Sequence, residues 1–216
     1  MMIMHWNSVL FGLFLVYSSI PSTFSSTYSP EFTKQVQEYP NVVTDLKKCV
    51  PQGNYHSQVN NVCDPDNLLL IGDINYLNKK IQDIKNYDKE NSRECDPDKP
   101  RPSIAIALVN EIKSNKKTSE DILNLASVFT YSLYDDWKIS SVCTSDKLII
   151  FYSKKDGALY TYAGTLMNEK LPSKKIIDIA VASKPFFSLG AARGLKYVLE
   201  RYSKAFLGRD KGVLGN

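Results

Sequence analysis

The spacing of apolar residues predicts several amphipathic helices after residue 70. Between residues 74 and 87, apolar side chains recur at intervals of three and four, which predicts a helix that begins near Asp73. A second helix is expected to begin at Thr118, a residue that caps helices well, and to bury Leu125, Phe129 and Trp137. The same period predicts helices over 173–183 and 191–206, separated at Lys184 and Pro185.

Two uninterrupted apolar runs, residues 103–109 and 147–153, are typical of strands that helices bury on both faces. Asp156-Gly157 then predicts a hairpin turn, with residues 159–163 returning as an antiparallel strand. The order of elements is therefore helix, strand, helix, strand, strand, helix, helix. This order predicts one α/β domain, a small mixed β-sheet flanked by helices on both faces.

The first part of the chain has a different pattern. The apolar run Val9–Tyr17 and the small residues at 21–26 predict a signal peptide over residues 1–25, although no Lys or Arg precedes the run. An uncleaved membrane anchor is the alternative. Residues 26–62 hold no sustained apolar period and are expected to form an extended lead-in to an α/β domain at 63–206. A polar tail follows at 207–216.

Export changes the interpretation of the four cysteines, which are Cys49, Cys63, Cys95 and Cys143. An even number of cysteines in an exported chain indicates disulfides, whereas zinc is disfavoured because no CxxC pair is present. Three pairings are possible. The shortest loops favour Cys49–Cys63 and Cys95–Cys143, and a loop of about 15 residues would contribute about 3 kcal/mol.

Charge and histidine content exclude several function classes. The net charge of +4 is too small to argue for a nucleic-acid or anionic-lipid partner, since the lysines are scattered among acids, and no nucleic-acid partner is expected. Of the two histidines, His5 lies in the predicted leader, so His56 in a polar segment is the remaining imidazole. A catalytic triad or a zinc site rich in histidine is therefore not expected. The motifs of phosphate-binding loops and of serine hydrolases are also absent from the sequence.

The remaining candidate chemistry is acidic. Asp64 and Asp66 precede the first helix of the domain, and Asp156 lies in the hairpin turn. Converging carboxylates could bind Ca²⁺ or Mg²⁺ and support hydrolysis of a phosphate ester, with Asp64 and Asp66 as the metal ligands. The structural alternative is that these aspartates form turns and interact with a helix dipole.

The order of these features resembles a known family. The segment Glu38-Tyr39-Pro40-Asn41, then Cys49, then Cys63-Asp64-Pro65-Asp66 before a helix is similar to the extracellular domain of nematode modulators of levamisole receptors. These proteins are members of the TPM domain family, which also includes proteins described as phosphatases. The similarity continues through the strand at 103–109 to residue 206.

The resemblance implies a sheet flanked by helices, the two disulfides named above, and a partner that is a cell-surface receptor, specifically a levamisole-sensitive acetylcholine-gated channel. Two departures affect the function. Gly157 follows Asp156 where family members commonly carry Arg, which weakens the expectation of phosphatase activity. The receptor modulators carry a transmembrane helix after the domain, whereas residues 207–216 are polar. We therefore expect a secreted, non-enzymatic binding protein, or a membrane-attached one if an anchor is missing from this chain.

Overall fold

The structure is a computed structural model of the chain, and it describes residues 28–52, 60–86, 102–115, 118–139, 146–168 and 170–206. Several predictions fall on other residues: the signal peptide, the Cys95–Cys143 pair, His56 and the polar tail all lie outside the described residues.

The described part of the chain contains one four-stranded sheet with strand order β1-β2-β3-β4. The strands are β1 (Val62–Cys63), β2 (Ser103–Val109), β3 (Lys147–Ser153) and β4 (Ala158–Ala163). The first three strands are parallel and β4 pairs antiparallel with β3. Every residue of β2 and β3 is buried, as their continuous apolar runs predict. The predicted fold class, a mixed sheet between helical layers, is confirmed.

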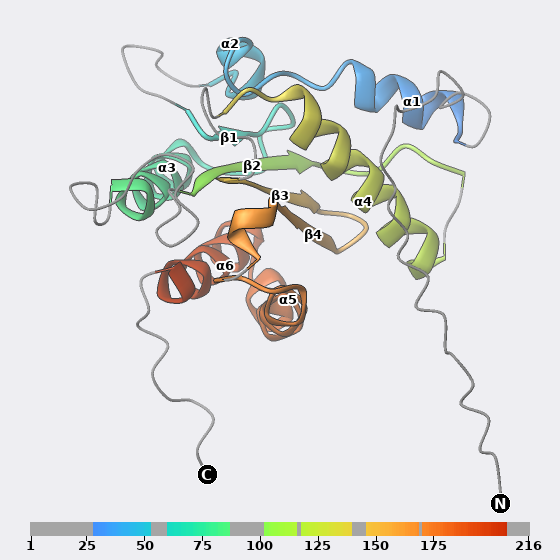
Figure 1. Ribbon diagram of the computed structural model, residues 1–216. Helices are drawn as coiled ribbons and strands as arrows, with labels where there is room; N and C mark the ends of the chain where they lie inside the picture. The colour runs from blue at the N-terminus through green and yellow to red at the C-terminus, as the bar shows by residue number, and fades with distance from the viewer. Residues whose placement is uncertain are drawn as a thin grey trace, which may run out of the picture.

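Helices cover both faces of this sheet (Figure 1). One layer contains α1 (Pro30–Gln37), α2 (Leu46–Cys49) and α4 (Ser119–Asp136); the other contains α3 (Ile71–Asn86), α5 (Ser173–Phe187) and α6 (Ala191–Phe206). A short 3₁₀ helix, Thr165–Met167, connects β4 to α5. Alternating side chains of β3 meet the two layers, since Phe151 packs on Phe129 of α4 and its neighbour Tyr152 stacks on Phe187 of α5.

The segment before the sheet is helical and contributes to the core, so its prediction as an extended lead-in is wrong. Ser29 caps α1 by accepting a hydrogen bond from the Phe32 N–H, and Pro30 occupies the first turn, where its missing N–H costs nothing. Phe32 and Val36 of this helix are buried. A helix of eight residues has too few apolar positions to reveal the helical period in the sequence. A helix this short is stabilised mainly by tertiary packing, here on α4.

Pro185 does not separate two helices as predicted. It lies inside the last turn of α5, which continues to Phe187 and is capped by Ser188. Proline has no N–H to donate to the carbonyl four residues before it, so α5 lacks one hydrogen bond at Pro185 and ends two residues later. The chain turns instead at Gly190, which has a φ of 126°, a value that glycine adopts readily and other residues rarely do.

Other local predictions are confirmed. The Thr118 hydroxyl accepts a hydrogen bond from the Asp121 N–H at the start of α4. The turn between β3 and β4 places Gly157 at a φ of 61°, as an Asp-Gly hairpin requires. No helix in the described ranges is both long enough and apolar enough to span a lipid bilayer.

Candidate functional site at the carboxyl edge of the sheet

The parallel pairing of β1, β2 and β3 brings the three candidate aspartates to one edge of the sheet. Cys63 lies opposite Ala107 and Val109 lies opposite Ser153, so the three strands end on the same side. We call this the carboxyl edge and define it as residues 64–66, 110–112 and 154–156. Asp64 and Asp66 follow β1 and Asp156 follows β3, so tertiary pairing unites residues that are about 90 positions apart in the sequence.

Asp66 and Asp156 both bind the backbone that follows β2. The Asn110 N–H donates to Asp66 Oδ2 at 2.7 Å, and the Ile112 N–H donates to Asp156 Oδ2 at 2.8 Å. The Ser153 hydroxyl also contacts Asp156 Oδ2. The two carboxylates therefore hold the same loop from two sides: Asp66 from the side of β1 and Asp156 from the side of β3.

Asp64 is buried and holds the turn that leads into α3. Its Oδ1 accepts a hydrogen bond from the Leu68 N–H at 2.9 Å, and its Oδ2 accepts one from the Leu69 N–H at 2.8 Å. Burial raises the pKa of Asp64, while these two N–H groups oppose the rise and Asp66 adds to it. Both carboxylate oxygens thus serve as acceptors for the backbone of this turn.

Tyr39 joins the two strands beyond the point at which their pairing ends. Its hydroxyl accepts a hydrogen bond from the Leu108 N–H at 3.0 Å and lies within donating distance of the carbonyl oxygens of Leu108, at 2.8 Å, and Cys63, at 3.0 Å. Burial raises the pKa of Tyr39 well above its ordinary value, and the charges of Asp64 and Asp66 add to this effect. The phenol therefore stays protonated and continues the β1–β2 contact with its own hydroxyl.

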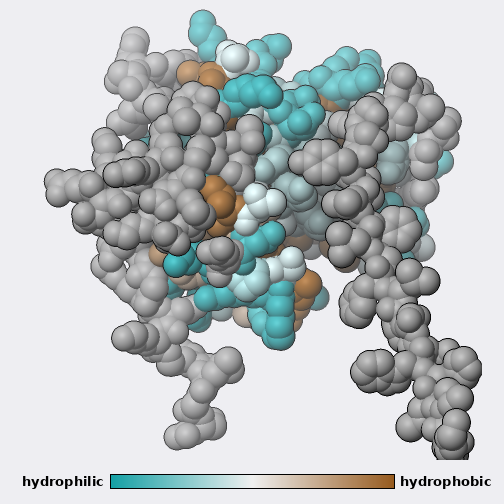
Figure 2. Space-filling model, in the orientation of Figure 1, coloured by the Kyte–Doolittle hydropathy of each residue, from teal (hydrophilic) through white to brown (hydrophobic). Residues whose placement is uncertain are grey.

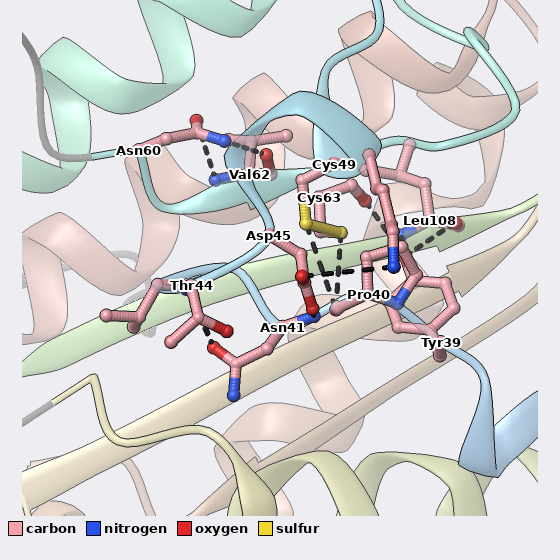
Figure 3. The surroundings of a disulfide bond; sticks show 12 residues. Tyr39, Pro40, Asn41, Thr44, Asp45, Cys49, Asn60, Val62, Cys63 and Leu108 are labelled. Atoms are coloured by element: carbon pink, nitrogen blue, oxygen red, sulfur yellow. Dashed lines mark hydrogen bonds and ion pairs between the residues drawn. A yellow bond between two sulfur atoms is a disulfide. The ribbon is translucent and has the colours of Figure 1, made fainter.

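The disulfide between Cys49 and Cys63 lies directly beside this tyrosine (Figure 3). It links α2 to β1, and the Asp64 N–H donates to the Cys49 carbonyl at 2.7 Å. The carbonyl oxygen of Pro40 faces both sulfur atoms (Figure 3). The pairing of the first two cysteines is therefore present in the structure as the sequence analysis favoured.

Asn41 shapes the turn that carries the chain from Tyr39 to α2. Its side-chain oxygen accepts hydrogen bonds from the N–H groups of Val43, at 2.9 Å, and Thr44, at 3.3 Å, while its own N–H donates to Asp45 (Figure 3). The segment Glu38–Asn41 that carries the family resemblance is thus a structural connection between α1, the disulfide and the sheet.

The outer part of the carboxyl edge carries opposite charges. Lys155 forms an ion pair with Glu111 at 3.0 Å between Nζ and Oε2, with both side chains more than half exposed. The positive charge of Lys154 opposes the rise in the pKa of Asp64. An exposed pair of this kind contributes little to stability, so these charges are available to a partner.

The contacts of the three aspartates define what this edge can do chemically. Among the residues that the structure describes, no group of three or more His, Cys, Asp or Glu side chains is arranged to hold a metal ion. The oxygens of Asp64, and one oxygen each of Asp66 and Asp156, already accept hydrogen bonds from the backbone or from Ser153. This geometry favours the structural reading of the aspartates, and the Ca²⁺ or Mg²⁺ site at Asp64 and Asp66 stays a prediction.

Sequence reasoning missed Tyr39, Asn41 and Asn110 as members of this site. Tyr39 acts through backbone groups of strands that follow it by 24 and 69 residues, a distance that no local pattern covers. Asn41 had a local signal, because Asn after Pro commonly binds the backbone two residues later.

A second feature is a hollow on the surface of the molecule. A surface hollow of about 330 Å³ between α4 and β4 is lined by Tyr28, Ser127, Val128, Tyr131, Ser132, Tyr160 and Tyr162. Tyr162 meets Tyr131 and Tyr134 edge to face, with ring centroids 5.4 and 4.6 Å apart. The hollow is aromatic and carries no charged lining residue.

The role of Asp64 can be tested through stability. Replacing Asp64 with Ala is expected to lower the free energy of unfolding by about 2 to 6 kcal/mol, because the N–H groups of Leu68 and Leu69 lose their acceptors at about 1 to 3 kcal/mol each. Urea denaturation measures the change. Asp83→Ala, an exposed aspartate of α3, is the matched control and should change stability by less than about 0.5 kcal/mol. Equal effects of the two substitutions would contradict the assignment.

The raised pKa of Asp64 also predicts a pH dependence. The folded protein holds the proton of Asp64 to a higher pH than the unfolded chain does, so this group lowers stability as pH rises from about 4 through its folded pKa. The stability of the wild type relative to Asp64→Asn should accordingly decrease between pH 4 and pH 7. A relative stability that increases over this range would contradict the burial argument.

Comparisons with known proteins give the family and agree with the fold. The family model described as Modulator of levamisole receptor-1 matches residues 34–157, more than half of the chain. These residues run from α1 to the turn after β3 and include the whole carboxyl edge and both cysteines of the disulfide. No curated protein matches the chain.

Among solved structures, the chain is similar to an NMR structure of the N-terminal domain of a protein from P. gingivalis. The TM-score is 0.51 with 14% identity, and the match covers 69% of this chain and 83% of that one. At this identity the likeness shows a shared fold. The family match confirms the family that the sequence resembles: the chain belongs to the modulator of levamisole receptor-1 family.

Proposed function

We propose that this protein is an extracellular, non-enzymatic modulator of a cell-surface receptor, namely a levamisole-sensitive acetylcholine-gated channel. The family match over residues 34–157 carries this proposal, because the family is described by its effect on such a receptor. The Cys49–Cys63 disulfide supports the extracellular location, since disulfides persist in oxidising compartments.

The geometry of the carboxyl edge supports binding rather than catalysis. Asp64, Asp66 and Asp156 use their oxygens to position backbone segments. This leaves a firmly held edge with an exposed Lys155–Glu111 pair on its surface. Rigid presentation of charged and apolar groups is what a binding surface needs, because little ordering entropy is lost on association.

The loop that Asp64 holds presents the most exposed large apolar residue among those described. Leu70 is 76% exposed and directly precedes α3, next to the partly exposed Ile71. An exposed apolar side chain next to a loop whose backbone Asp64 holds is a suitable contact point for a receptor subunit. We assign the receptor contact to Leu70 and the adjacent carboxyl edge.

The test is co-expression with levamisole-sensitive receptor subunits and recording of agonist-evoked currents. Wild-type protein should change the current amplitude or its agonist dependence, and it should co-purify with the receptor. Leu70→Asp should weaken both effects at least tenfold, because a buried charge replaces an apolar contact. Leu123→Asp on α4 is the matched control, since Leu123 is also exposed and lies in the opposite helical layer; it should leave both effects unchanged.

Unchanged currents together with no co-purification would overturn the proposed function. Equal losses in Leu70→Asp and Leu123→Asp would overturn the assignment of the contact surface. Hydrolysis of a generic phosphate ester that is lost in Asp66→Asn would instead support the metal-dependent phosphatase hypothesis.

A further inference from the structure

Helix α5 is apolar on the side that faces solvent as well as on the side that faces the core. Ile179 is buried and Phe187 stacks on Tyr152 of β3, with ring centroids 4.3 Å apart. On the outer side, Ile177 is 60% exposed and Val181 is 58% exposed. A surface helix normally carries polar residues on its outer side, so these exposed residues require a separate explanation.

The exposed apolar residues continue through the turn after α5. Pro185 is exposed, Phe186 is 38% exposed and Leu189 is 63% exposed. Ile177, Val181 and Pro185 are spaced four residues apart, so they lie along one line of the helix. We define the α5 stripe as Ile177, Val181, Pro185, Phe186 and Leu189. An apolar patch on a stable monomer of this size often marks an interaction surface.

The part of the chain that carries the stripe is rich in basic residues. Residues 170–206 contain eight basic side chains and two acidic ones, and the basic residues are Lys170, Lys174, Lys175, Lys184, Arg193, Lys196, Arg201 and Lys204. Lys184 is exposed beside the stripe, and Lys174 is exposed in an ion pair with Asp178. The basic excess of this α5–α6 hairpin exceeds the net charge of +4 for the whole chain.

An aromatic contact joins the stripe to a basic line on α6. Phe186 stacks on Tyr197 with ring centroids 4.2 Å apart, and the Arg201 guanidinium lies 5.0 Å from the centroid of the Tyr197 ring. Arg193, Tyr197 and Arg201 are spaced four residues apart and line one side of α6. Figure 2 shows hydrophobic and hydrophilic residues side by side at the lower margin, where Figure 1 places α5.

The charge pattern decides which occupant this surface fits. A second copy of the chain would bring two basic hairpins together, and like charges across an interface oppose association. A bilayer that contains anionic lipid satisfies both features at once, because the apolar residues enter the boundary of the acyl chains while Lys and Arg meet the headgroups. Aromatic side chains such as Phe186 and Tyr197 also suit this boundary.

We infer that the α5 stripe and the adjoining basic line of α6 dock the domain onto the surface of an anionic phospholipid membrane. Helix α5 lies flat on the bilayer with Ile177 and Val181 inserted, and Lys184, Arg193 and Arg201 contact lipid phosphates. Residues 158–206, which contain this surface, lie outside the family-matched range 34–157. The domain therefore carries two separate surfaces, the carboxyl edge for a receptor and the α5 stripe for lipid.

The experiment is vesicle co-sedimentation of the full chain. Vesicles of phosphatidylcholine with 30% phosphatidylglycerol (about one third anionic lipid, enough for a strong surface potential) are compared with pure phosphatidylcholine. The wild type should bind the anionic vesicles and lose affinity as the salt concentration rises. The double substitution Ile177→Ser and Val181→Ser should lower the partition coefficient by about tenfold or more, because two inserted side chains are lost.

Matched variants separate the surface from general effects. Every variant carries the same N-terminal segment, so any contribution of residues 1–27 to lipid binding is shared. Lys184→Glu should reduce binding several-fold, whereas Lys79→Glu on the exposed side of α3 should not. Leu70→Ser and Leu123→Ser remove exposed apolar residues elsewhere and should also have no effect. Circular dichroism melting confirms that each variant is folded.

Three results would overturn the inference. These are no binding of the wild type to anionic vesicles, equal binding by the Ile177→Ser and Val181→Ser variant, or a wild-type dimer that this variant converts to a monomer in sedimentation equilibrium. The last result would show that a second copy covers the stripe. The measurement contains no receptor, so its failure leaves the proposed receptor function standing, and loss of receptor modulation leaves lipid binding standing.

Discussion

Replacing Phe32 with Ala is expected to lower the free energy of unfolding by about 3 to 5 kcal/mol, a large fraction of the stability of a single domain. Phe32 is fully buried although it lies in the segment before the sheet. Its ring meets Phe129 edge to face at 6.2 Å and Tyr28 at 5.5 Å, and Phe129 in turn packs on Phe151 of the central strand β3. Removing the ring leaves a cavity between α1 and α4 that the sheet cannot fill.

Urea denaturation followed by tryptophan fluorescence measures this change, because Trp137 is buried in the same layer and stacks on Tyr39. Phe186→Ala is the matched control, since it truncates a phenylalanine of the α5 stripe that is partly exposed. This substitution removes the stack on Tyr197, worth about 0.5 to 1.5 kcal/mol. A Phe32→Ala protein as stable as the control would show that α1 is not part of the core.

Replacing both Cys49 and Cys63 with Ala is expected to lower the free energy of unfolding by about 3 kcal/mol, because a closed loop of this length no longer restricts the unfolded chain. The two cysteines are 14 residues apart and both are fully buried. Both proteins are compared under oxidising conditions, so that Cys95 and Cys143 are in the same state in each. A variant as stable as the oxidised wild type would contradict the prediction.

Loss of the disulfide should loosen the backbone near Cys63 more than it loosens the central strands. The Asp64 N–H donates to the Cys49 carbonyl, and Asp64 holds the turn to α3 through the N–H groups of Leu68 and Leu69. Hydrogen exchange should therefore quicken at Asp64, Leu68 and Leu69 in the double variant. The amides of β3, which is covered on both faces, should exchange as in the wild type at conditions that favour local opening. Faster exchange in β3 alone would contradict this order.

Local chemistry explains the elements that could be predicted. The bounds of β2 and β3 agree with the two apolar runs. A strand that is buried on both faces is apolar at every position, so it can be recognised from its own sequence. The cap of α4 at Thr118 and the turn at Gly157 depend on neighbouring atoms only, so residue types identify them. The α3 and α6 helices were visible because 16 residues display several turns of the apolar period.

Elements with short or unusual sequences were missed for identifiable reasons. Strand β1 has two residues, too few for a pattern, and it forms because the disulfide and the Tyr39 hydroxyl hold it against β2. Helix α1 depends on packing against α4 rather than on its own propensity. Helix α5 continues for two residues past Pro185, and Phe187 at its end stacks on Tyr152 of β3, a tertiary contact that the local sequence does not reveal.

By itself, the sequence determined the class of fold, the two central strands, the capped and amphipathic helices, the family, and the aspartates worth examining. Those features depend on residue type and on spacing within a few turns. Only the tertiary structure decided that the Tyr39 hydroxyl joins two strands, that both Asp64 oxygens accept hydrogen bonds from backbone N–H groups, and that α5 exposes Ile177 and Val181. Hydrogen-bond partners and solvent exposure are properties of atoms brought together from distant positions, so they exist only after the chain has packed.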